Sequence, residues 1–469
     1  MRAAVVTMGC KVNQAESASL LTQLSQAGYE LSQPEGADVV VLNTCSVTAR
    51  ADKEVFSLLR RLRRRNPRAW LVATGCLAYL SPAALVGPEL ADQALKLGEG
   101  ANLAQWLPRF PNKTALELTP EPLSRATPEA SLNDSLADQS ALNNSPVNDE
   151  LGNDELGMAG LASFLPGRTR AFLKVQDGCS ANCAYCVVPL ARGPARSLGL
   201  PVVRERLRTL WASGAREVVL TGVHLGHYGR DLGLTLTDLL AALAETVPQT
   251  PNGDQWRGRL RLSSLEPLEI DQAYPALGGG WLAPHIHAPL QSGSDPVLRR
   301  MGRPYSRADY QRAIWGLVDK FGPLALGTDV LVGFPGETEG EFRETRDLLA
   351  SLPLSYWHVF PYSPRPGTRA ATWPDQVPGQ VKKERVQLLK ELGEKKRAQF
   401  LLTQYPLRHL ALVENTLDAQ GRRRVLTGTY LRAVWADSSQ PAPNSLIWVS
   451  LSPPPPGGDN LPLAKPWSS

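Results

Sequence analysis

Three of the six cysteines form a C-x-x-x-C-x-x-C motif, at Cys179, Cys183 and Cys186. This spacing supplies three thiolates to a [4Fe-4S] cluster and leaves one iron open, whereas an electron-transfer cluster normally has four cysteine ligands. An open iron can chelate the amino and carboxylate groups of S-adenosylmethionine and pass an electron to its sulfonium. The motif therefore predicts radical chemistry. The alternative is a structural zinc site, which needs a fourth ligand close by; His224 is the nearest histidine, and the local sequence offers no such partner.

The other three cysteines, Cys10, Cys45 and Cys76, each lie just beyond a short run of β-branched and small apolar residues. Such runs, separated by helical stretches, predict buried parallel strands. Because the carboxyl ends of parallel strands meet at one edge of an open α/β sheet, we expect the three thiols to converge. A second [4Fe-4S] cluster with an open iron fits this pattern best. The alternative is three buried, unreactive cysteines.

These two sets leave no cysteine for a disulfide framework, which is in any case unexpected in a chain of 469 residues. The apolar run at the start is short and ends at Gly9, so we expect no secretory leader. No apolar stretch approaches the roughly 20 residues that a membrane-spanning helix needs. We therefore expect a soluble, cytoplasmic protein with no membrane contact.

Composition divides the chain into segments. Residues 114–160 contain no aromatic residue and no cysteine, and they carry nine acidic residues against one basic residue, so we expect an insertion that is disordered or loosely packed. Without it the chain is more basic than its net charge of +5, which suits a polyanionic partner. The predicted segments are a cluster-binding domain at 1–110, the insertion and linker at 111–164, a central core at 165–400, a small β-barrel at 405–452 and a flexible tail at 453–469.

Between residues 168 and 370 strands and helices alternate, which predicts six βα units. This number is too small for a complete eight-stranded barrel and suits a partial one that is open at the side. The predicted fold class is thus α/β: a Rossmann-like parallel domain, a partial (βα)6 barrel of the TIM type and a small C-terminal β-barrel. The expected strands of the partial barrel cover residues 172–176, 218–221, 259–263, 285–289, 325–332 and 355–359.

The first of these strands runs into the cysteine motif, which places the predicted cluster at the carboxyl ends of the strands, where such barrels have their active sites. Polar or glycine-rich segments follow other strands, and we expect Gly222, Ser264 and Gln291 within them to contact S-adenosylmethionine. Tyr185 is placed to lie against its adenine, although it is equally suited to a core position. Each glycine-rich segment is also compatible with a simple turn.

Two basic features are candidates for contact with nucleic acid. The arginine-rich stretch at residues 60–65 would surround a helix, so part of it must face solvent whatever its role. The second, at residues 422–424, lies in a β-rich segment, 410–451, whose size is typical of small RNA-binding barrels; a packing appendage is the alternative. A charged helix at residues 381–400 is expected to link the partial barrel to this segment.

The histidines indicate function less clearly than the cysteines do. His285 and His287 are two apart on a predicted strand and share a face, for which a hydrogen-bonded interior position is favoured over metal binding. The remaining four, His224, His227, His358 and His409, suggest no role. Because the chain has no G-x-G-x-x-G sequence and no P-loop, its first domain is not visibly a nucleotide site.

Together these motifs resemble the radical S-adenosylmethionine methylthiotransferases over nearly the whole chain. Within that family, residues 9–14 and 220–226 are most similar to the subgroup that modifies threonylcarbamoyladenosine next to the tRNA anticodon. The long insertion departs from the compact hinge that is usual in the family. The segments that carry the resemblance are 7–17, 43–48, 74–76, the central cysteine motif with 188–189 and 191–193, 261–267, 290–293, 333–338 and 360–368.

The resemblance implies a reaction in which the C–H bond at C2 of adenosine 37 is replaced by C–S–CH3. That bond is neither acidic nor electrophilic enough for side-chain acid or base catalysis, so a radical is required. It also implies two [4Fe-4S] clusters, S-adenosylmethionine as methyl donor and radical source, and a TRAM barrel that binds the tRNA anticodon stem-loop. An electron donor such as flavodoxin or ferredoxin and a sulfur source are implied partners. The alternatives are another tRNA adenosine derivative, a ribosomal-protein aspartate, or an iron–sulfur RNA-binding module without catalysis.

Overall fold

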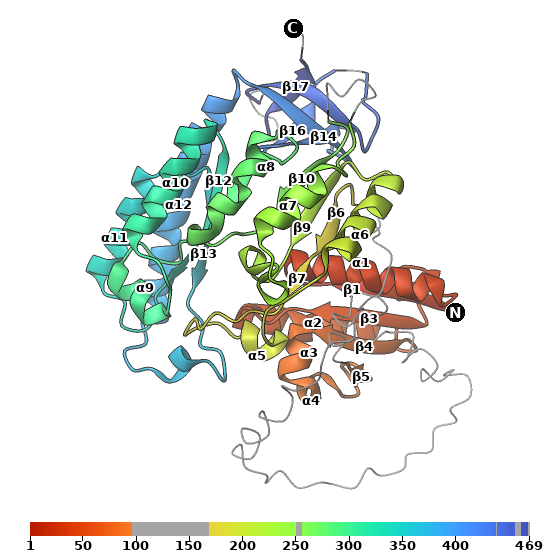
Figure 1. The fold of residues 1–469 in the computed structure, drawn as a ribbon. Helices are drawn as coiled ribbons and strands as arrows, with labels where there is room; N and C mark the ends of the chain where they lie inside the picture. Colours follow the sequence, from red (N-terminus) through yellow and green to blue (C-terminus); the bar gives the residue numbers. More distant parts are fainter. Residues whose placement is uncertain (96–167, 250–255, 438, 455–460, 468–469) are drawn as a thin grey trace, which may run out of the picture.

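The computed structural model describes residues 1–95, 168–249, 256–437, 439–454 and 461–467. The expected insertion at 111–164 lies outside the described residues. Three units follow one another along the chain: an N-terminal α/β unit, a central half-barrel and a small C-terminal barrel, with the half-barrel between the other two (Figure 1). In the described part of the chain, no helix combines the length and the apolar character that crossing a bilayer requires.

The N-terminal unit is a parallel sheet in the order β2-β1-β3-β4-β5, with β3 at its centre and every residue of β3 buried. Helix α2 packs on it through Val55, Leu59 and Leu62, whose spacing places them on one helix face. The expected run of β-branched strands is confirmed. The strands are β1 (Arg2–Thr7), β2 (Glu30–Leu31), β3 (Val39–Thr44), β4 (Trp70–Gly75) and β5 (Gln93–Ala94), and the helices are α1 (Lys11–Gln26), α2 (Ala49–Arg65), α3 (Cys76–Leu80) and α4 (Pro82–Leu85).

The central unit consists of two three-stranded parallel sheets, in the orders β6-β9-β10 and β11-β12-β13. Each of the six predicted strands overlaps one of them, so the partial barrel is confirmed. The strands are β6 (Ala171–Lys174), β9 (Glu217–Thr221), β10 (Arg259–Leu262), β11 (His285–His287), β12 (Ala325–Val332) and β13 (Tyr356–Pro361).

Helices cover the outside of the half-barrel and bury its main apolar core (Figure 1). Helix α11 shows why they form: Thr338 and Glu341 make a capping box at its start, and Phe342, Leu348 and Leu349 face the core. These helices are α6 (Leu200–Ala212), α7 (Leu236–Ala244), α8 (Tyr274–Gly278), α9 (Asp295–Met301), α10 (Arg307–Phe321) and α11 (Glu339–Ser351).

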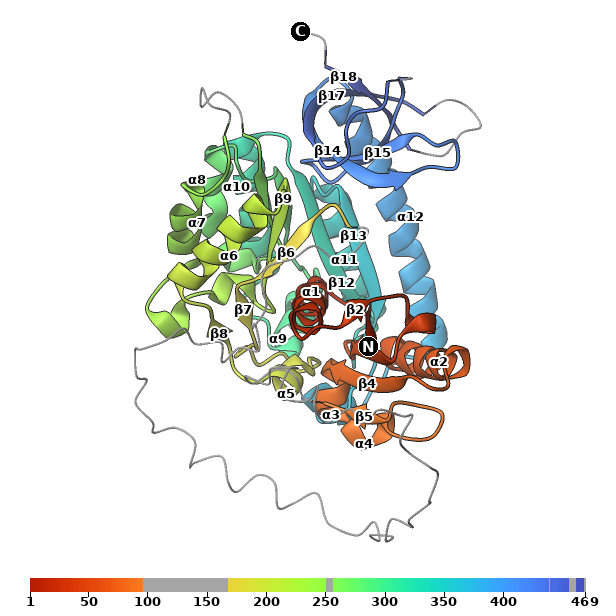
Figure 2. The same cartoon turned by 90° about the vertical axis from the view of Figure 1, so that its right-hand side faces the viewer.

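The open side of the half-barrel, between β6 and β13, is occupied by helix α1 of the N-terminal unit (Figure 2). An ion pair of 2.9 Å between Lys174 on β6 and Glu16 on α1 joins the two units. The interior of the half-barrel is therefore walled partly by its own strands and partly by the N-terminal unit.

Helix α12 (Gly379–Gln404) leads from the half-barrel to the closed C-terminal barrel β14-β15-β16-β18-β17. The predicted flexible tail at 453–469 is wrong in one part, because β18 lies within it and completes this barrel. It pairs with β16 on one side and with β17 on the other, so both edges gain hydrogen-bond partners. The strands are β14 (Arg408–Leu417), β15 (Arg423–Thr427), β16 (Arg432–Trp435), β17 (Leu446–Ser452) and β18 (Leu463–Pro466).

Candidate active site: two cysteine triplets joined by an arginine

The first triplet, Cys10, Cys45 and Cys76, lies at the carboxyl edge of the N-terminal sheet. Cys10 is the residue before α1, Cys45 follows β3, and Cys76 follows β4 as the first residue of α3. The thiols lie close enough to influence one another: burial together with the neighbouring Cys76 and Cys10 raises the pKa of Cys45 to about 11. The predicted convergence of these cysteines is confirmed.

The loops that carry Cys10 and Cys45 touch each other. Gly9 has φ +98°, and a Cβ atom at this position would lie 2.5 Å from the Cβ of Cys45, so only glycine fits. Asn13 ties the loops together, because its Nδ2 donates hydrogen bonds of 2.8 Å to the carbonyls of Met8 and Thr44. The positions of the thiols are therefore set by close backbone contact as well as by the strands.

The second triplet, Cys179, Cys183 and Cys186, lies in a loop that begins and ends in a short hairpin of β7 (Gln176–Asp177) and β8 (Arg196–Ser197). The guanidinium of Arg303 donates a hydrogen bond of 3.3 Å to the Cys183 sulfur. Burial raises the pKa of Cys186 to about 12. The Cys186 thiol would be protonated by itself and become a ligand only when a metal displaces the proton.

The gathering of the sulfur atoms argues against zinc at either triplet. A tetrahedral zinc ion at about 2.3 Å from each sulfur brings its ligands to about 3.8 Å from one another. In the described residues, only two groups have three ligand atoms within 4.8 Å of one another, and both consist of histidines and a carboxylate. Neither cysteine triplet has its three sulfur atoms within this distance of one another, so neither is gathered as tightly as a zinc site requires.

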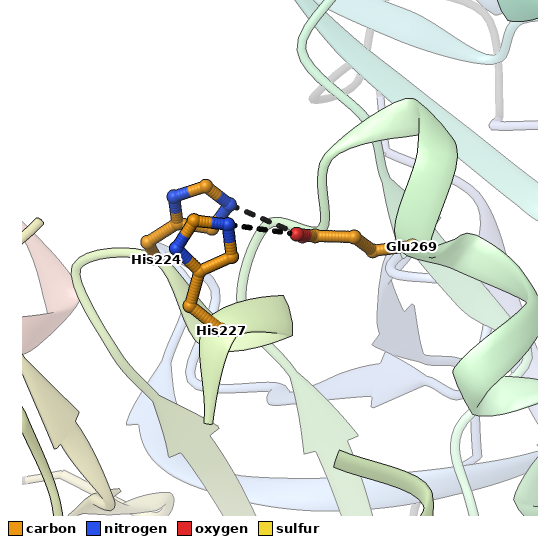
Figure 3. Close-up of side chains that lie close together, drawn as sticks. All are labelled: His224, His227 and Glu269. Carbon is orange, nitrogen blue, oxygen red and sulfur yellow. Dashed lines mark hydrogen bonds and ion pairs between the residues drawn. The ribbon is translucent and has the colours of Figure 1, made fainter. Parts of the chain in front are cut away.

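His224 contacts the second triplet, which the sequence analysis did not predict. Its Nδ1 lies 3.6 Å from the Cys179 sulfur and its Nε2 lies 3.1 Å from Glu269, while its ring stacks on His227 at 3.4 Å between centroids (Figure 3). The expectation that the cysteine motif has no histidine nearby is therefore wrong. Although burial alone would lower it, hydrogen bonds with Cys179 and Glu269 raise the pKa of His224 to about 9.

The reason for this error is sequence distance. His224 follows β9 and lies 45 residues from Cys179. Since β9 is the neighbour of β6 in the sheet, the loops after the two strands meet at one end of the half-barrel. Two clues were available: His224 lies three residues beyond the end of a predicted strand, and it belongs to the segment 220–226 that resembles the subgroup.

Arg192 connects the two triplets. Its Nε lies 3.4 Å from the Cys76 sulfur, and Nη2 donates a hydrogen bond of 3.0 Å to Asn13. In the other direction, Nη1 contacts Glu16 at 2.7 Å and Asp177 at 3.0 Å. The next residue, Gly193, accepts a hydrogen bond of 3.0 Å from the backbone N–H of Cys179. One side chain thus spans from the sulfur of one triplet to the loop of the other.

The charges around Arg192 are balanced. Lys174 completes the group with ion pairs of 2.9 Å to Glu16 and 2.8 Å to Asp177, so that two cations meet two carboxylates. Although burial alone would raise them, the neighbouring cations lower the pKa values of both carboxyls. The group joins α1 to the start of the cysteine loop and is held in its charged form.

A second polar region lies deeper in the half-barrel. The rings of His285 and His287 are 2.7 and 3.1 Å from the Tyr356 hydroxyl, which confirms their predicted hydrogen-bonded interior position. His287 and His358 flank Asp329 at 3.1 and 3.0 Å, so His358 also has a partner that the sequence did not indicate.

Comparison with known proteins places this arrangement in a family. A model described as "Uncharacterized protein family UPF0004" matches residues 2–94, and the radical SAM superfamily matches residues 173–349. A protein of Aquifex aeolicus named threonylcarbamoyladenosine tRNA methylthiotransferase MtaB is 36% identical over 89% of this chain and 94% of its own. The chain belongs to the radical S-adenosylmethionine methylthiotransferase family. It is a radical enzyme that transfers a methylthio group.

Other relatives of this methylthiotransferase support the same family assignment. The protein of the same name from Thermotoga maritima is 36% identical over 82% of this chain and 80% of its own. A tRNA-2-methylthio-N(6)-dimethylallyladenosine synthase of Lawsonia intracellularis is 31% identical over 82% and 80%. Among solved structures, the radical S-adenosylmethionine methyltransferase TsrM of Kitasatospora setae has a TM-score of 0.50 at 17% identity, covering 79% of this chain and 77% of TsrM, and shares the fold.

The predicted S-adenosylmethionine contacts of the methylthiotransferase lie at several places around the cysteine loop. Gly222 lies beside the start of this loop: an added Cβ would lie 2.8 Å from Oε1 of Gln176, whose Nε2 donates to the carbonyl of Gly178. Tyr185 packs edge-on against Phe334 at 6.4 Å between centroids, which fits a core position as well as a cofactor contact. Gln291 and Ser264 follow β11 and β10, and Gln291 has φ +63°. The role of these four residues stays a prediction.

The basic features of the methylthiotransferase are partly structural. Arg63 on α2 pairs with Asp92 at 2.6 Å, and Arg422 pairs with Asp418 at 2.7 Å. The rest of the arginine run on α2 is exposed, as expected for residues around a helix. A cavity of about 480 Å³ opens between β13, α12 and the C-terminal barrel, and its lining includes Lys390, Arg397, Arg432, Trp357 and Phe400.

Proposed function

We propose that this enzyme converts threonylcarbamoyladenosine at position 37 of tRNA to its 2-methylthio derivative. The observation that carries the proposal is the group of relatives with this activity in their name, which are 34–36% identical over more than four fifths of the chain. The two cysteine triplets joined through Arg192 support it, because the reaction needs a radical and a sulfur donor at one carbon atom.

Each triplet has a proposed cofactor. Cys179, Cys183 and Cys186 hold the [4Fe-4S] cluster that binds S-adenosylmethionine, and Cys10, Cys45 and Cys76 hold a second one. When bound, these groups supply a 5′-deoxyadenosyl radical that takes the hydrogen from C2 and a sulfur that carries a methyl group from S-adenosylmethionine. The C-x-x-x-C-x-x-C motif supports the first assignment, and the common position of the other three cysteines at the carboxyl edge of the sheet supports the second.

The side chains around the triplets have the task of stabilising thiolate charge. Arg303 donates to Cys183 and His224 lies beside Cys179, so two donors favour negative charge on these sulfurs. Arg192 does the same at Cys76 while Glu16 and Asp177 hold its guanidinium in place. Hydrogen bonds of this kind also tune the reduction potential of a cluster.

Further partners are part of the proposal. The C-terminal barrel and the adjoining basic cavity, which partly buried aromatic side chains also line, suit the anticodon stem-loop, because RNA is bound through phosphate charge and base stacking. The enzyme also needs an electron donor such as flavodoxin or ferredoxin and a source of sulfur. We further propose a cytoplasmic location, where tRNA is present and thiols stay reduced.

Anaerobic reconstitution tests the proposal. The enzyme with both clusters is incubated with S-adenosylmethionine, dithionite and anticodon stem-loops that carry threonylcarbamoyladenosine or dimethylallyladenosine, or with a ribosomal-protein peptide. We expect methylthio product from the threonylcarbamoyl stem-loop alone. Product from either of the other two would reassign the substrate, and absence of 5′-deoxyadenosine from all three would show a module without catalysis.

Nucleoside mass spectrometry of cells lacking the gene provides the matching test in vivo. The methylthio derivative of threonylcarbamoyladenosine should disappear and its unmodified precursor should accumulate. Loss of the dimethylallyl derivative instead would point to the related activity.

A further inference from the structure

Three side chains on the inner face of the half-barrel converge on one point. His287 on β11, Asp329 on β12 and His358 on β13 come from three neighbouring parallel strands. His358 is the register partner of Asp329, and His287 is the partner of Gly327, two residues earlier, so all three side chains lie on the same face of the sheet. The alternate side chains of β12 belong to the core under the outer helices, so this face is the inner one.

The distances in this group match those between the ligands of a metal ion. Nε2 of His287 lies 3.1 Å and Nδ1 of His358 lies 3.0 Å from Asp329, and both nitrogens contact the same oxygen atom, Oδ1. Ligand atoms about 2.1 Å from a metal lie about 3.0–3.4 Å from one another at octahedral or tetrahedral angles. Glu217 shows the other arrangement, that of a paired carboxylate, because Arg261 Nε contacts its Oε1 and Arg259 Nε contacts its Oε2.

The charge of this group also favours a cation. Among the described residues, no lysine or arginine lies within ion-pair distance of Asp329, whose two close partners are both imidazoles. Other carboxylates of low exposure in the half-barrel have such a partner, namely Asp177, Glu217, Glu269 and Glu337. A bound metal ion would give Asp329 the permanent positive charge that its surroundings lack.

The second group of gathered ligand atoms, His224, His227 and Glu269, is less suited to a metal (Figure 3). Arg230 contacts Oε1 of Glu269 at 3.0 Å, and His227 contacts the same oxygen at 3.1 Å. A permanent cation thus already lies where a metal ion would bind. His224 is in addition engaged with the Cys179 sulfur.

Surrounding residues orient the group on the inner face and give access to it. The Tyr356 hydroxyl lies 3.1 Å from Nδ1 of His287, which leaves Nε2 directed at Asp329, and metal-binding imidazoles usually have an outer hydrogen bond of this kind. Gly327 makes room for this contact, because an added Cβ would lie 2.7 Å from Nδ1 of His287 and would collide with the Tyr356 ring. His358 is 59% exposed and lines the cavity of about 480 Å³, which provides an entry path for an ion.

We propose that His287, Asp329 and His358 bind a divalent transition-metal ion, separate from the two iron–sulfur clusters. Imidazole ligands suit Mn²⁺, Fe²⁺ or Zn²⁺, whereas Mg²⁺ and Ca²⁺ take oxygen ligands. Three protein ligands leave at least one coordination position open, which water or an oxygen ligand from the cavity would fill. His285 takes no part and keeps the hydrogen-bonded role that the sequence predicted for both histidines of β11.

Manganese is the probe for the test, because EPR distinguishes free from bound Mn²⁺ and because thiolate sites favour softer metals. The anaerobically reconstituted holoenzyme, with both clusters in the diamagnetic [4Fe-4S]²⁺ state, is titrated with Mn²⁺ in the absence of tRNA. We expect one bound ion per chain, and pulsed EPR should show couplings from two imidazole nitrogens. Zn²⁺ should release the Mn²⁺, since zinc binds nitrogen and oxygen ligands more tightly than manganese does.

Variants identify the ligands. His358→Gln, at the most exposed ligand, and Asp329→Asn should each weaken Mn²⁺ binding by more than about tenfold, and Tyr356→Phe should weaken it by about tenfold through the lost outer hydrogen bond. His358→Gln should also lose one imidazole coupling while its iron content matches the wild type. The controls are His227→Gln, from the second group, and Asp347→Asn, an exposed carboxylate on α11, and both should bind Mn²⁺ as the wild type does.

Three outcomes would overturn the inference. One is a wild-type holoenzyme that binds neither Mn²⁺ nor Zn²⁺, or that binds Mn²⁺ without any imidazole coupling, a result that needs no variant to fold. Another is unchanged affinity in both His358→Gln and Asp329→Asn, which would leave the three side chains as a hydrogen-bonded group only. The third is loss of the ion in His227→Gln, which would place the metal at Glu269 instead.

Discussion

Replacing Arg192 by glutamine tests whether the buried charge group holds the N-terminal unit against the half-barrel. The side chain is 9% exposed and contacts Glu16 and Asp177, which are 17% and 5% exposed. Glu16 belongs to α1 and Asp177 to the start of the cysteine loop. Without Arg192, the two carboxylates would share Lys174 as their only close cation among the described residues.

The expected loss of stability in Arg192→Gln follows from these contacts. Removing one partner of a buried ion pair costs about 3–5 kcal/mol, because the other charge is left uncompensated. Lys174 stays in contact with both carboxylates, so the lower end, about 3 kcal/mol, is expected. The pKa values of Glu16 and Asp177 should rise, since Arg192 is one of the groups that lower them.

Hydrogen exchange of the metal-free protein measures the effect where it acts. Amides of α1 and of the cysteine loop should lose protection by about 3 kcal/mol in Arg192→Gln, equal to roughly a hundredfold faster exchange. The matched control is Arg50→Gln, which breaks an exposed pair with Glu54 and should cost less than about 0.5 kcal/mol. Equal exchange in the two variants would refute the view that Arg192 joins the units.

Three further predictions concern the triplets and the histidine pair. Cys10→Ala should reduce iron from about eight to about four per chain and abolish methylthio transfer while 5′-deoxyadenosine is still formed; full iron content would disprove the second cluster. Gly9→Ala should have the same effect, because its Cβ would collide with Cys45, and an unchanged iron count would contradict that contact. His224 and His227 outweigh the effect of burial and lower the pKa of Glu269 to about 2. The ionised carboxylate therefore stabilises the fold above pH 4.5, the ordinary pKa of this side chain, and this stabilisation is lost as the pH falls towards 2. Glu269→Gln should therefore be less stable at pH 7 by about 3 kcal/mol and lose less stability between pH 4.5 and 3 in acid unfolding; parallel curves for the two proteins would argue against the assignment.

Much of the scaffold follows from local pattern. Short β-branched runs and the helices between them predicted the parallel sheet and the six strands of the half-barrel, because side-chain periodicity reports burial directly. Strand β18 was missed for a related reason. A four-residue strand, Leu463–Pro466, has too little periodicity to stand out in a proline-rich tail, and it forms because β16 and β17 both need a partner.

The candidate site was likewise predicted only in part from the sequence. The cysteines were found because their spacing and their position after strands are properties of the chain itself. The roles of Arg192 and His224 were not found, although both belong to segments that carry the family resemblance. Their partners lie in other units or 45 residues away, as for His224 and Cys179.

The sequence by itself determined the chemistry, because it contains two sets of three thiols. One set was recognised from its close spacing along the chain, and the other from its positions at the ends of predicted strands. What only the tertiary structure decided is how they are brought together, through Arg192, which lies between the two triplets. The physical reason is that a ligand motif depends on local geometry, whereas a buried charge is assigned its partner only when separate elements pack and exclude water.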